Sequence, residues 1–159
     1  MDYHAHGLVT SEYLYTADGK KLQGAVYDYD LKTLAVGNNT TDAVVFPALK
    51  TLVQSNFDEA SGDSLSVAVS NTYDDYGNLQ GYKETTTGYS LEANINYHKI
   101  ADKYIVGVPS HITVSSGGKT YRERSTKVDG NGEITEIMLH NGDKPSVYNM
   151  TYDGYGNIT

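Results

Sequence analysis

The residues of this chain that could do chemistry are histidine pairs and aspartate pairs, beginning with His4 and His6. Two alternating histidines on a strand face the same side, where imidazole pairs can bind a transition metal. No carboxylate is obviously placed to complete such a site, and chain termini tend to fray. We therefore interpret the pair as structural, and the sequence predicts neither a metal site nor a cofactor.

Two aspartate pairs, Asp28 with Asp30 and Asp74 with Asp75, have the residue type that glycoside hydrolysis uses as acid and base. Asp74 and Asp75 belong to a turn-like sequence, in which an aspartate side chain accepts backbone N–H bonds at the bend. A structural role is therefore favoured over catalysis for these carboxylates.

The stretch from Asp129 to Ile134, DGNGEI, imitates part of a calcium-binding loop. If Gly132 is the loop glycine, the first ligand position falls on Lys127 and the last on Met138. Neither side chain is a carboxylate, so an EF-hand is excluded and a looser calcium site is disfavoured.

The remaining histidines, His98, His111 and His140, are scattered, and no motif supplies a serine or aspartate partner for them. The sequence therefore predicts that the chain has no catalytic residue and is not an enzyme. A hydrolase that uses scattered carboxylates stays open as an alternative. A cleft with convergent acids and one strongly shifted pKa would favour it.

Composition narrows the class of protein. The formal net charge is -8 and the pI about 4.9, so the chain repels a phosphate backbone and nucleic acid is not an expected partner. No apolar run has the length of a membrane helix, and no membrane insertion is expected. The absence of cysteine excludes disulfides. With 15 Tyr and 16 Gly, the chain is typical of short strands joined by turns.

A turn motif organises these strands: a leading residue, usually Tyr, is followed four positions later by Gly. Two copies are nearly identical, YDDYGN at 73–78 and YDGYGN at 152–157, and two are looser, YTADGK at 15–20 and VDGNGE at 128–133. Asp and Asn favour bends through local side-chain hydrogen bonds, and Gly accepts positive φ. The residues assigned to these turns are Tyr15, Asp18, Gly19, Tyr73, Asp74, Gly77, Asn78, Asp129, Gly132, Tyr152, Asp153, Gly156 and Asn157.

Strand patterns lie between the turns. Apolar and polar residues alternate at 64–70 and again at 147–152, which predicts strands. A strand at 112–114 should turn at 115–118 and return over 119–128. The run 134–139 should reverse at Asn141-Gly142, a two-residue hairpin signal. Further strands and loops are predicted at 26–34 (strand), 38–42 (loop) and 58–63 (loop).

The segment 46–57 is ambiguous. Phe46, Leu49, Leu52 and Val53 have helix-like spacing, with Pro47 suited to a first helical turn. A strand is favoured, but if the chain contains a short helix, this segment is its expected place.

The motif Tyr-Asp-x-x-Gly-Asn resembles the signature of YD repeats, which occur in bacterial Rhs proteins and toxin-complex subunits. TYDDYGNLQGYKE and TYDGYGNIT match it closely, VDGNGEITEI loosely, and the stretch IVGVPSHITVSSGGKTYRERSTKV resembles the segment before such a repeat. The resemblance covers 60–159 well and 8–57 more faintly. The unequal spacing of the motif departs from tandem arrays.

The resemblance implies an all-β fold, in which antiparallel β-hairpins over 1–159 form one segment of an extended, twisted sheet. It also implies a non-catalytic part of a large bacterial protein, at the cell surface or outside the cell, whose shell encloses a toxin domain. The expected partners are the rest of the parent chain and that domain. No signal peptide is evident in MDYHAHGLV, so any export signal is expected outside this chain.

A second interpretation stays open. Tyr-rich β surfaces suit sugar stacking, so the chain could be a carbohydrate- or protein-binding module of a bacterial surface protein.

The sequence ends about three residues after the bend of the last motif. Tyr152 should end a strand, Gly156 should lie at the bend and Ile158 should begin a return strand. The sequence predicts a fragment that either associates through an unpaired edge or leaves 153–159 disordered.

Overall fold

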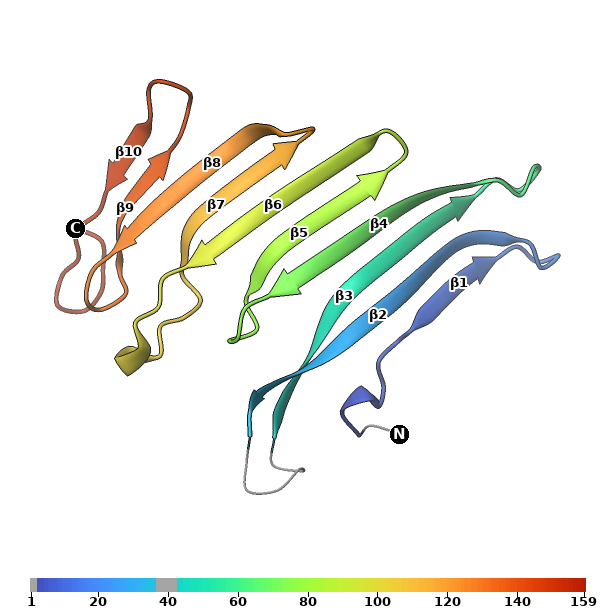
Figure 1. Cartoon of the computed structure of the whole chain (residues 1–159), viewed down its shortest axis with the longest axis horizontal. Helices are drawn as coiled ribbons and strands as arrows, with labels where there is room; N and C mark the ends of the chain where they lie inside the picture. The colour runs from blue at the N-terminus through green and yellow to red at the C-terminus, as the bar shows by residue number, and fades with distance from the viewer. Residues whose placement is uncertain (1–2, 37–42) are drawn as a thin grey trace. The chain divides into compact units, whose positions relative to one another are not determined.

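The computed structural model describes residues 3–36 and 43–159. Within these ranges the chain is all-β: ten antiparallel strands follow one another, and the only helices are two short 3-10 turns (Figure 1). This confirms the predicted fold class of antiparallel hairpins. The predicted loop at 38–42 lies outside the described residues.

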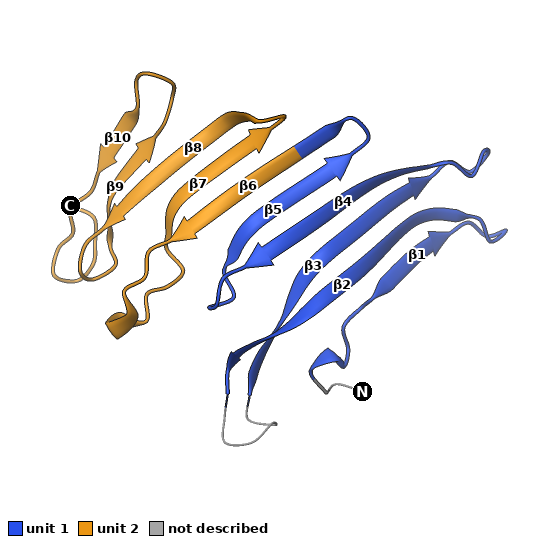
Figure 2. Ribbon diagram, viewed as in Figure 1, with its two compact units in different colours: residues 1–90 blue, residues 91–159 orange. Residues whose placement is uncertain are grey.

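Two compact units make up the chain, residues 1–90 and 91–159 (Figure 2). The boundary falls within β6 (Tyr89–Tyr97). The sequence predicts one segment over 1–159, and that description of the domain stays a prediction.

The first unit contains β1 (Ser11–Tyr15), β2 (Lys21–Ala35), β3 (Val44–Phe57), β4 (Ser64–Tyr73) and β5 (Leu79–Thr86). Each of these strands pairs antiparallel with the next one in the sequence, so every connection is a hairpin. The first 3-10 turn, η1 (Tyr3–Ala5), precedes them.

The second unit contains the end of β6, followed by β7 (Pro109–Ser116), β8 (Lys119–Val128), β9 (Ile134–Leu139) and β10 (Ser146–Asn149). These strands also pair with their sequence neighbours, and all of the pairs are antiparallel. The long β6–β7 connection holds the second 3-10 turn, η2 (Ala101–Lys103).

Several predicted strands and turns are confirmed. The alternating stretch 64–70 lies in β4, 26–34 lies in β2, and β8 and β9 have the predicted bounds. The turn at 115–118 is a two-residue hairpin loop, because Ser116 pairs with Lys119. Gly117 and Gly118 have φ of 57° and 77°, the positive values that such a loop needs.

The segment 46–57 contains no helix; it is the greater part of β3. Val53 is paired on both sides, with Val26 of β2 and Ala68 of β4. Hydrogen-bonded pairing with the two neighbouring strands favours the strand conformation, although the apolar residues have helix-like spacing. Pro47 lies opposite Leu31 of β2, in the part of β3 beyond its register with β4, where a missing N–H is tolerated.

Two further predictions are corrected. The β9–β10 connection is not a two-residue turn at Asn141-Gly142, because the last pair of the ladder is Leu139 with Ser146. The predicted strand at 147–152 is shorter: β10 ends at Asn149, and Tyr152 forms only an isolated bridge to Ile158.

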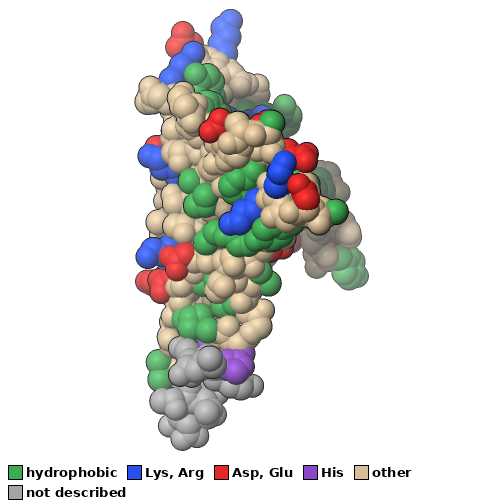
Figure 3. Space-filling view, turned by 90° about the vertical axis from the view of Figure 1, so that its right-hand side faces the viewer, with side chains coloured by type: hydrophobic (Ala, Val, Ile, Leu, Met, Phe, Trp, Pro, Cys, Tyr) green, Lys and Arg blue, Asp and Glu red, His purple; other side chains and the backbone are tan. Residues whose placement is uncertain are grey.

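Side-chain burial is slight throughout the described residues. The buried apolar side chains are Ala25 and Ala48, at 6% and 3% exposure, and the buried polar one is Asp74, at 5%. All three belong to the first unit. Figure 3 shows apolar side chains lying at the surface between charged ones. Such exposure is expected of a sheet that has no second layer packed on it.

The described residues include no helix with the length and hydropathy needed to cross a bilayer.

Candidate functional site

The four motif turns share one backbone geometry. In each, the leading residue pairs with the residue six positions later. The pairs are Tyr15 with Lys21, Tyr73 with Leu79, Val128 with Ile134, and Tyr152 with Ile158. The N–H of the second motif residue donates to the carbonyl of the sixth, and the N–H of the motif glycine donates to the carbonyl of the second. The motif therefore encodes one hydrogen-bonded turn, used four times.

The aspartate at the second position holds this turn from inside. Asp74 Oδ1 accepts the N–H groups of Tyr76 and Asn78, each at 2.9 Å. The Asn78 amide donates to the other carboxylate oxygen at 3.1 Å. Asp153 makes the same bonds with Tyr155 and Asn157. This explains why Asp and Asn stand four residues apart in the motif.

The motif glycines have nearly equal, positive φ values, which L side chains rarely adopt. The values are 85° at Gly19, 85° at Gly77, 85° at Gly132 and 82° at Gly156. The surroundings of the four glycines differ. A Cβ at Gly19 would meet nothing within 4 Å, whereas one at Gly77 would contact Phe46 at 3.4 Å.

The first turn departs from the prediction. Thr16, not Asp18, occupies the aspartate position: its Oγ1 accepts the N–H of Lys20 at 2.9 Å. Asp18 is two positions later, where its carboxylate accepts the Thr16 hydroxyl and lies 3.8 Å from Lys20 Nζ. A hydroxyl can replace the carboxylate because the turn needs only a short side chain with an acceptor.

A fifth turn lies in the predicted loop 58–63 and is held by Asp58. The role of Asp58 was not identified from the sequence, because this turn is one residue longer than the motif. The Asp58 N–H donates to the Asp63 carbonyl at 2.8 Å, and the Gly62 N–H donates to the Asp58 carbonyl at 2.9 Å. Asp58 Oδ1 accepts the N–H groups of Ala60 and Ser61. The sequence did contain a signal for this turn: Asp58 is followed four positions later by Gly62, and both lie between two strands.

The leading tyrosines tie the turns to neighbouring strands. The Tyr73 hydroxyl donates to the Leu49 carbonyl of β3 at 3.1 Å, and its ring meets Phe46 edge-on at 5.3 Å. The Tyr152 hydroxyl donates to the Ile134 carbonyl of β9 at 2.8 Å. Residues 151–159 form a closed turn, because the Thr159 N–H donates to the Thr151 carbonyl at 2.9 Å. Association of the chain through an edge strand stays a prediction.

Hydrogen bonding shifts the acidity of the turn carboxylates. The backbone N–H of Glu133 is the largest cause that holds the pKa of Asp129 below its usual value. For Asp153, the Asn157 side chain is the largest cause of a lowered pKa. Desolvation, followed by the charge of Asp129, raises the pKa of Glu133.

Acid should therefore weaken the second unit. A carboxyl whose folded pKa is lowered stabilises the fold above its unfolded pKa, and this stability is lost as the pH falls through the folded value, below about pH 4. We expect urea unfolding of β8 and β9, followed by amide NMR signals, to show this loss. Replacing both Asp129 and Asp153 with asparagine should flatten it, because the amide oxygen still accepts the N–H bonds but does not titrate.

The opposite sign applies to Glu133. Its raised pKa means that its contribution is present below its unfolded pKa and is lost as the pH rises through the folded value. Glu133→Gln should therefore raise stability at pH 7 and leave the loss below pH 4 unchanged. A flat profile in the wild type would contradict the role of these carboxylates.

Four side chains of the second unit come together in a way that the sequence did not indicate. His111 Nε2 lies 2.9 Å from Glu123 Oε1, and Ser125 Oγ lies 3.1 Å from His140 Nε2. The two imidazole rings are 6.4 Å apart. The register of β7 with β8 places His111 opposite Ser125, and only tertiary pairing reveals this. The carboxylate contacts His111, not the histidine beside the serine, so no Ser-His-acid triad forms.

The other candidate residues are not brought into a common site. His4 belongs to η1 and not to a strand, so the predicted alternation on one strand face is absent. Asp75 is 96% exposed at its side chain and lies 3.4 Å from Lys32, whereas Asp74 is enclosed in its turn. Asp28 and Asp30 lie exposed on β2. No three His, Asp or Glu side chains of the described ranges converge as metal ligands.

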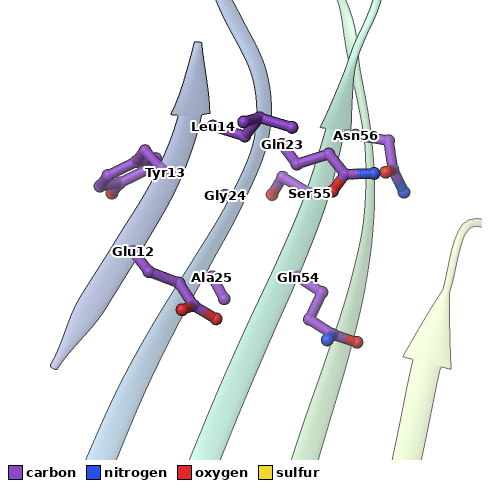
Figure 4. Close-up of a pocket in the computed structure, with 9 residues that line it drawn as sticks. All are labelled: Glu12, Tyr13, Leu14, Gln23, Gly24, Ala25, Gln54, Ser55 and Asn56. Carbon is purple, nitrogen blue, oxygen red and sulfur yellow. The ribbon is translucent and has the colours of Figure 1, made fainter. Parts of the chain in front are cut away.

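A groove of about 430 Å³ crosses β1, β2 and β3 (Figure 4). Ala25 forms its floor, with Glu12 and Gln54 on the flanking strands in the same row. Leu14, Gln23 and Asn56 form the next row. The groove thus combines a carboxylate and three amides with the apolar side chains of Leu14 and Ala25.

No family model matches this chain, and no curated protein matches it.

Proposed function

We propose that this chain is a structural, non-catalytic β segment of a large bacterial protein of the YD-repeat type. In that protein it would form part of the wall of a shell or of a surface scaffold. The single observation that carries this proposal is the repetition of one turn. Four hairpins are closed by the same bonds between the second, fifth and sixth motif residues. The YD signature supplies the acceptor side chain and the glycine of positive φ that these turns use.

The layer architecture supports a wall. Within each unit the strands pair with their sequence neighbours, and the described residues bury only Ala25, Ala48 and Asp74. Backbone ladders and turns, more than an apolar core, hold such a layer together. Its mechanism is steric: hairpins extend the layer, and the layer separates a space or presents a surface. In the proposed parent, which lies at the surface or outside the cell, the enclosed space holds a toxin domain.

Electron microscopy of the gene product purified from its source tests this proposal. We expect a hollow particle whose wall is β-structured. A compact particle without a cavity, or a particle with measurable hydrolase activity abolished by Glu123→Gln, would contradict it.

If the turns are interchangeable structural units, one copy should accept the sequence of another. Gly154→Asp converts YDGYGN into YDDYGN. Gly154 has no positive φ, and a Cβ there meets nothing within 4 Å. We expect the free energy of unfolding of the Gly154→Asp variant to stay within about 0.5 kcal/mol of that of the wild type, as for ordinary surface changes. Gly156→Asp in the same turn is the matched control and should destabilise it, because φ there is 82°.

The groove on β1–β3 favours a second candidate function, saccharide binding. The side-chain amides of Gln23, Gln54 and Asn56 form no hydrogen bond within the described chain, and carboxylate and amide groups suit sugar hydroxyls. A glycan array of the whole chain tests this function. A specific hit that Gln54→Ala abolishes would support it, and an array without hits would exclude it.

A further inference from the structure

The only two arginines of the chain lie two positions apart on β8. Arg122 is opposite Val114 of β7; Arg124 is opposite Ile112 of β7 and Leu139 of β9. Residues directly opposite in antiparallel strands share a face of the sheet. At about 3.3 Å per residue, the two arginines are roughly 7 Å apart along the strand.

Aliphatic side chains surround this pair. Ile95 of β6 lies opposite Ile112, and Ala93 lies opposite Val114. Ile137 alternates with Leu139 along β9 and therefore shares its face. We call this surface the arginine face; it consists of Ala93, Ile95, Ile112, Val114, Arg122, Arg124, Ile137 and Leu139.

The strand carboxylates of the second unit all lie on the opposite face. Glu92, Glu123 and Glu136 alternate with members of the arginine face along β6, β8 and β9. There Glu123 contacts His111, and Glu136 Oε1 lies 3.0 Å from Lys127 Nζ. Cationic arginine and anionic glutamate are therefore separated by the sheet, although the chain as a whole is acidic.

Neither guanidinium has a salt-bridge, side-chain hydrogen-bond or ring partner within residues 3–36 and 43–159. No residue of 91–159 is buried: Arg122 is exposed, and the other members of the arginine face are half-buried. A sheet face rich in aliphatic side chains is stabilised when another layer packs on it. Such a layer would take the guanidinium groups out of water, which is favourable only if carboxylates pair with them.

We propose that the arginine face docks an acidic polypeptide, whose contact surface combines aliphatic side chains with two carboxylates, one for each arginine. Arginine binds carboxylates through two parallel hydrogen bonds, which fixes the geometry of the partner. An anionic membrane or a nucleic acid fits less well, because two cations on a chain of net charge -8 offer little attraction to a dense array of negative charges. The inference does not depend on the proposed wall function.

Fluorescence anisotropy of a labelled peptide of the sequence Val-Ser-Val-Ser-Glu-Ser-Glu-Ser-Val-Ser tests the proposal with the whole chain. When this peptide is extended, its valines and its two glutamates lie on one face, and the glutamates have the spacing of the two arginines. A peptide in which glutamine replaces glutamate is its matched control. We expect the glutamate peptide to bind and the glutamine peptide to bind at least tenfold more weakly. Removing each arginine should weaken binding about tenfold, as expected for one charged hydrogen bond.

The variants separate recognition from net charge. Arg122→Gln with Arg124→Gln should lose binding. Lys127→Gln with Lys144→Gln is an equal change of charge and should keep it, because Lys127 lies opposite Glu136 on the other face of the sheet and Lys144 lies in the β9–β10 connection. Arg122→Lys with Arg124→Lys should bind at an intermediate level, because lysine keeps the charge but lacks the planar fork. Circular dichroism of each variant checks that the sheet persists.

Several outcomes would overturn the proposal. The first is that the wild type does not bind the glutamate peptide. The second is that the double Arg→Gln variant and the double Lys→Gln variant lose the same amount of binding affinity. The third is that the arginines mediate binding to phosphatidylserine vesicles and not to the peptide. Arginine-dependent self-association in light scattering would assign the face to a second copy of the chain instead.

Discussion

Replacing Gly132 with alanine is expected to destabilise the second unit by about 3 kcal/mol. Two effects add at this position. Its φ is 85°, where an alanine is strained by roughly 1–2 kcal/mol. A Cβ there would also overlap Ile105 Cδ1 of the long β6–β7 connection, and such overpacking costs about 1–3 kcal/mol. Urea unfolding followed by the amide NMR signals of β8 and β9 measures the loss.

Two alanine variants separate these effects. Gly19→Ala has the same φ of 85° but open space around its Cβ, so it should show the backbone strain alone, about 1–2 kcal/mol. Gly130→Ala is in the same turn as Gly132, without positive φ and without a neighbour within 4 Å, and should be nearly neutral. If Gly132→Ala and Gly19→Ala lose equal stability, Ile105 does not pack on Gly132 as the structure shows.

Asp74→Ala is the second change with a large expected effect, a loss of about 3 kcal/mol from the first unit. The substitution leaves the N–H groups of Tyr76 and Asn78 and the Asn78 amide without their acceptor. Asp74 is only 5% exposed, so water replaces the carboxylate poorly. Hydrogen bonds to a charged group contribute about 1.5–3 kcal/mol, and donors left unpaired add to the loss.

Matched variants test whether burial decides the size of this effect. Asp153→Ala removes the same bonds in an exposed turn and should cost less, because water satisfies the freed donors there. Asp74→Asn should recover part of the loss, since its amide oxygen can accept the N–H bonds. Urea unfolding followed by the signals of β4 and β5 measures the first unit. Equal losses at Asp74 and Asp153 would contradict a role for burial.

These two experiments concern turns that the sequence located correctly, because a turn is a local object. Asp74, Gly77 and Asn78 are within five positions of one another, and their hydrogen bonds close inside that span. Side-chain acceptors and a residue that adopts positive φ therefore suffice to predict the bend. The same local logic located the Gly117-Gly118 hairpin and the alternating strand of β4.

Where local signals were degenerate, the sequence was less informative. Asp18 and Thr16 both offer a short side chain with an acceptor, and only the observed bond from the Lys20 N–H identifies Thr16 as the residue that holds the turn. At 46–57, helical spacing competed with strand formation. The pairing of Val53 with Val26 and Ala68 decided the outcome, and both partners are far away in the sequence.

By itself, then, the sequence determined the all-β class, most strand positions and the places where the chain reverses, because these depend on side-chain alternation and on hydrogen bonds between near neighbours. Only the tertiary structure decided the contacts that cross strands. His111 meets Glu123, and Arg122 and Arg124 share one aliphatic face, because the ladder register sets which residues are opposite. A shift of one residue in that register would move a side chain to the other face of the sheet. The bulges beside the turns set the register, and no short stretch of sequence contains both partners of such a pair.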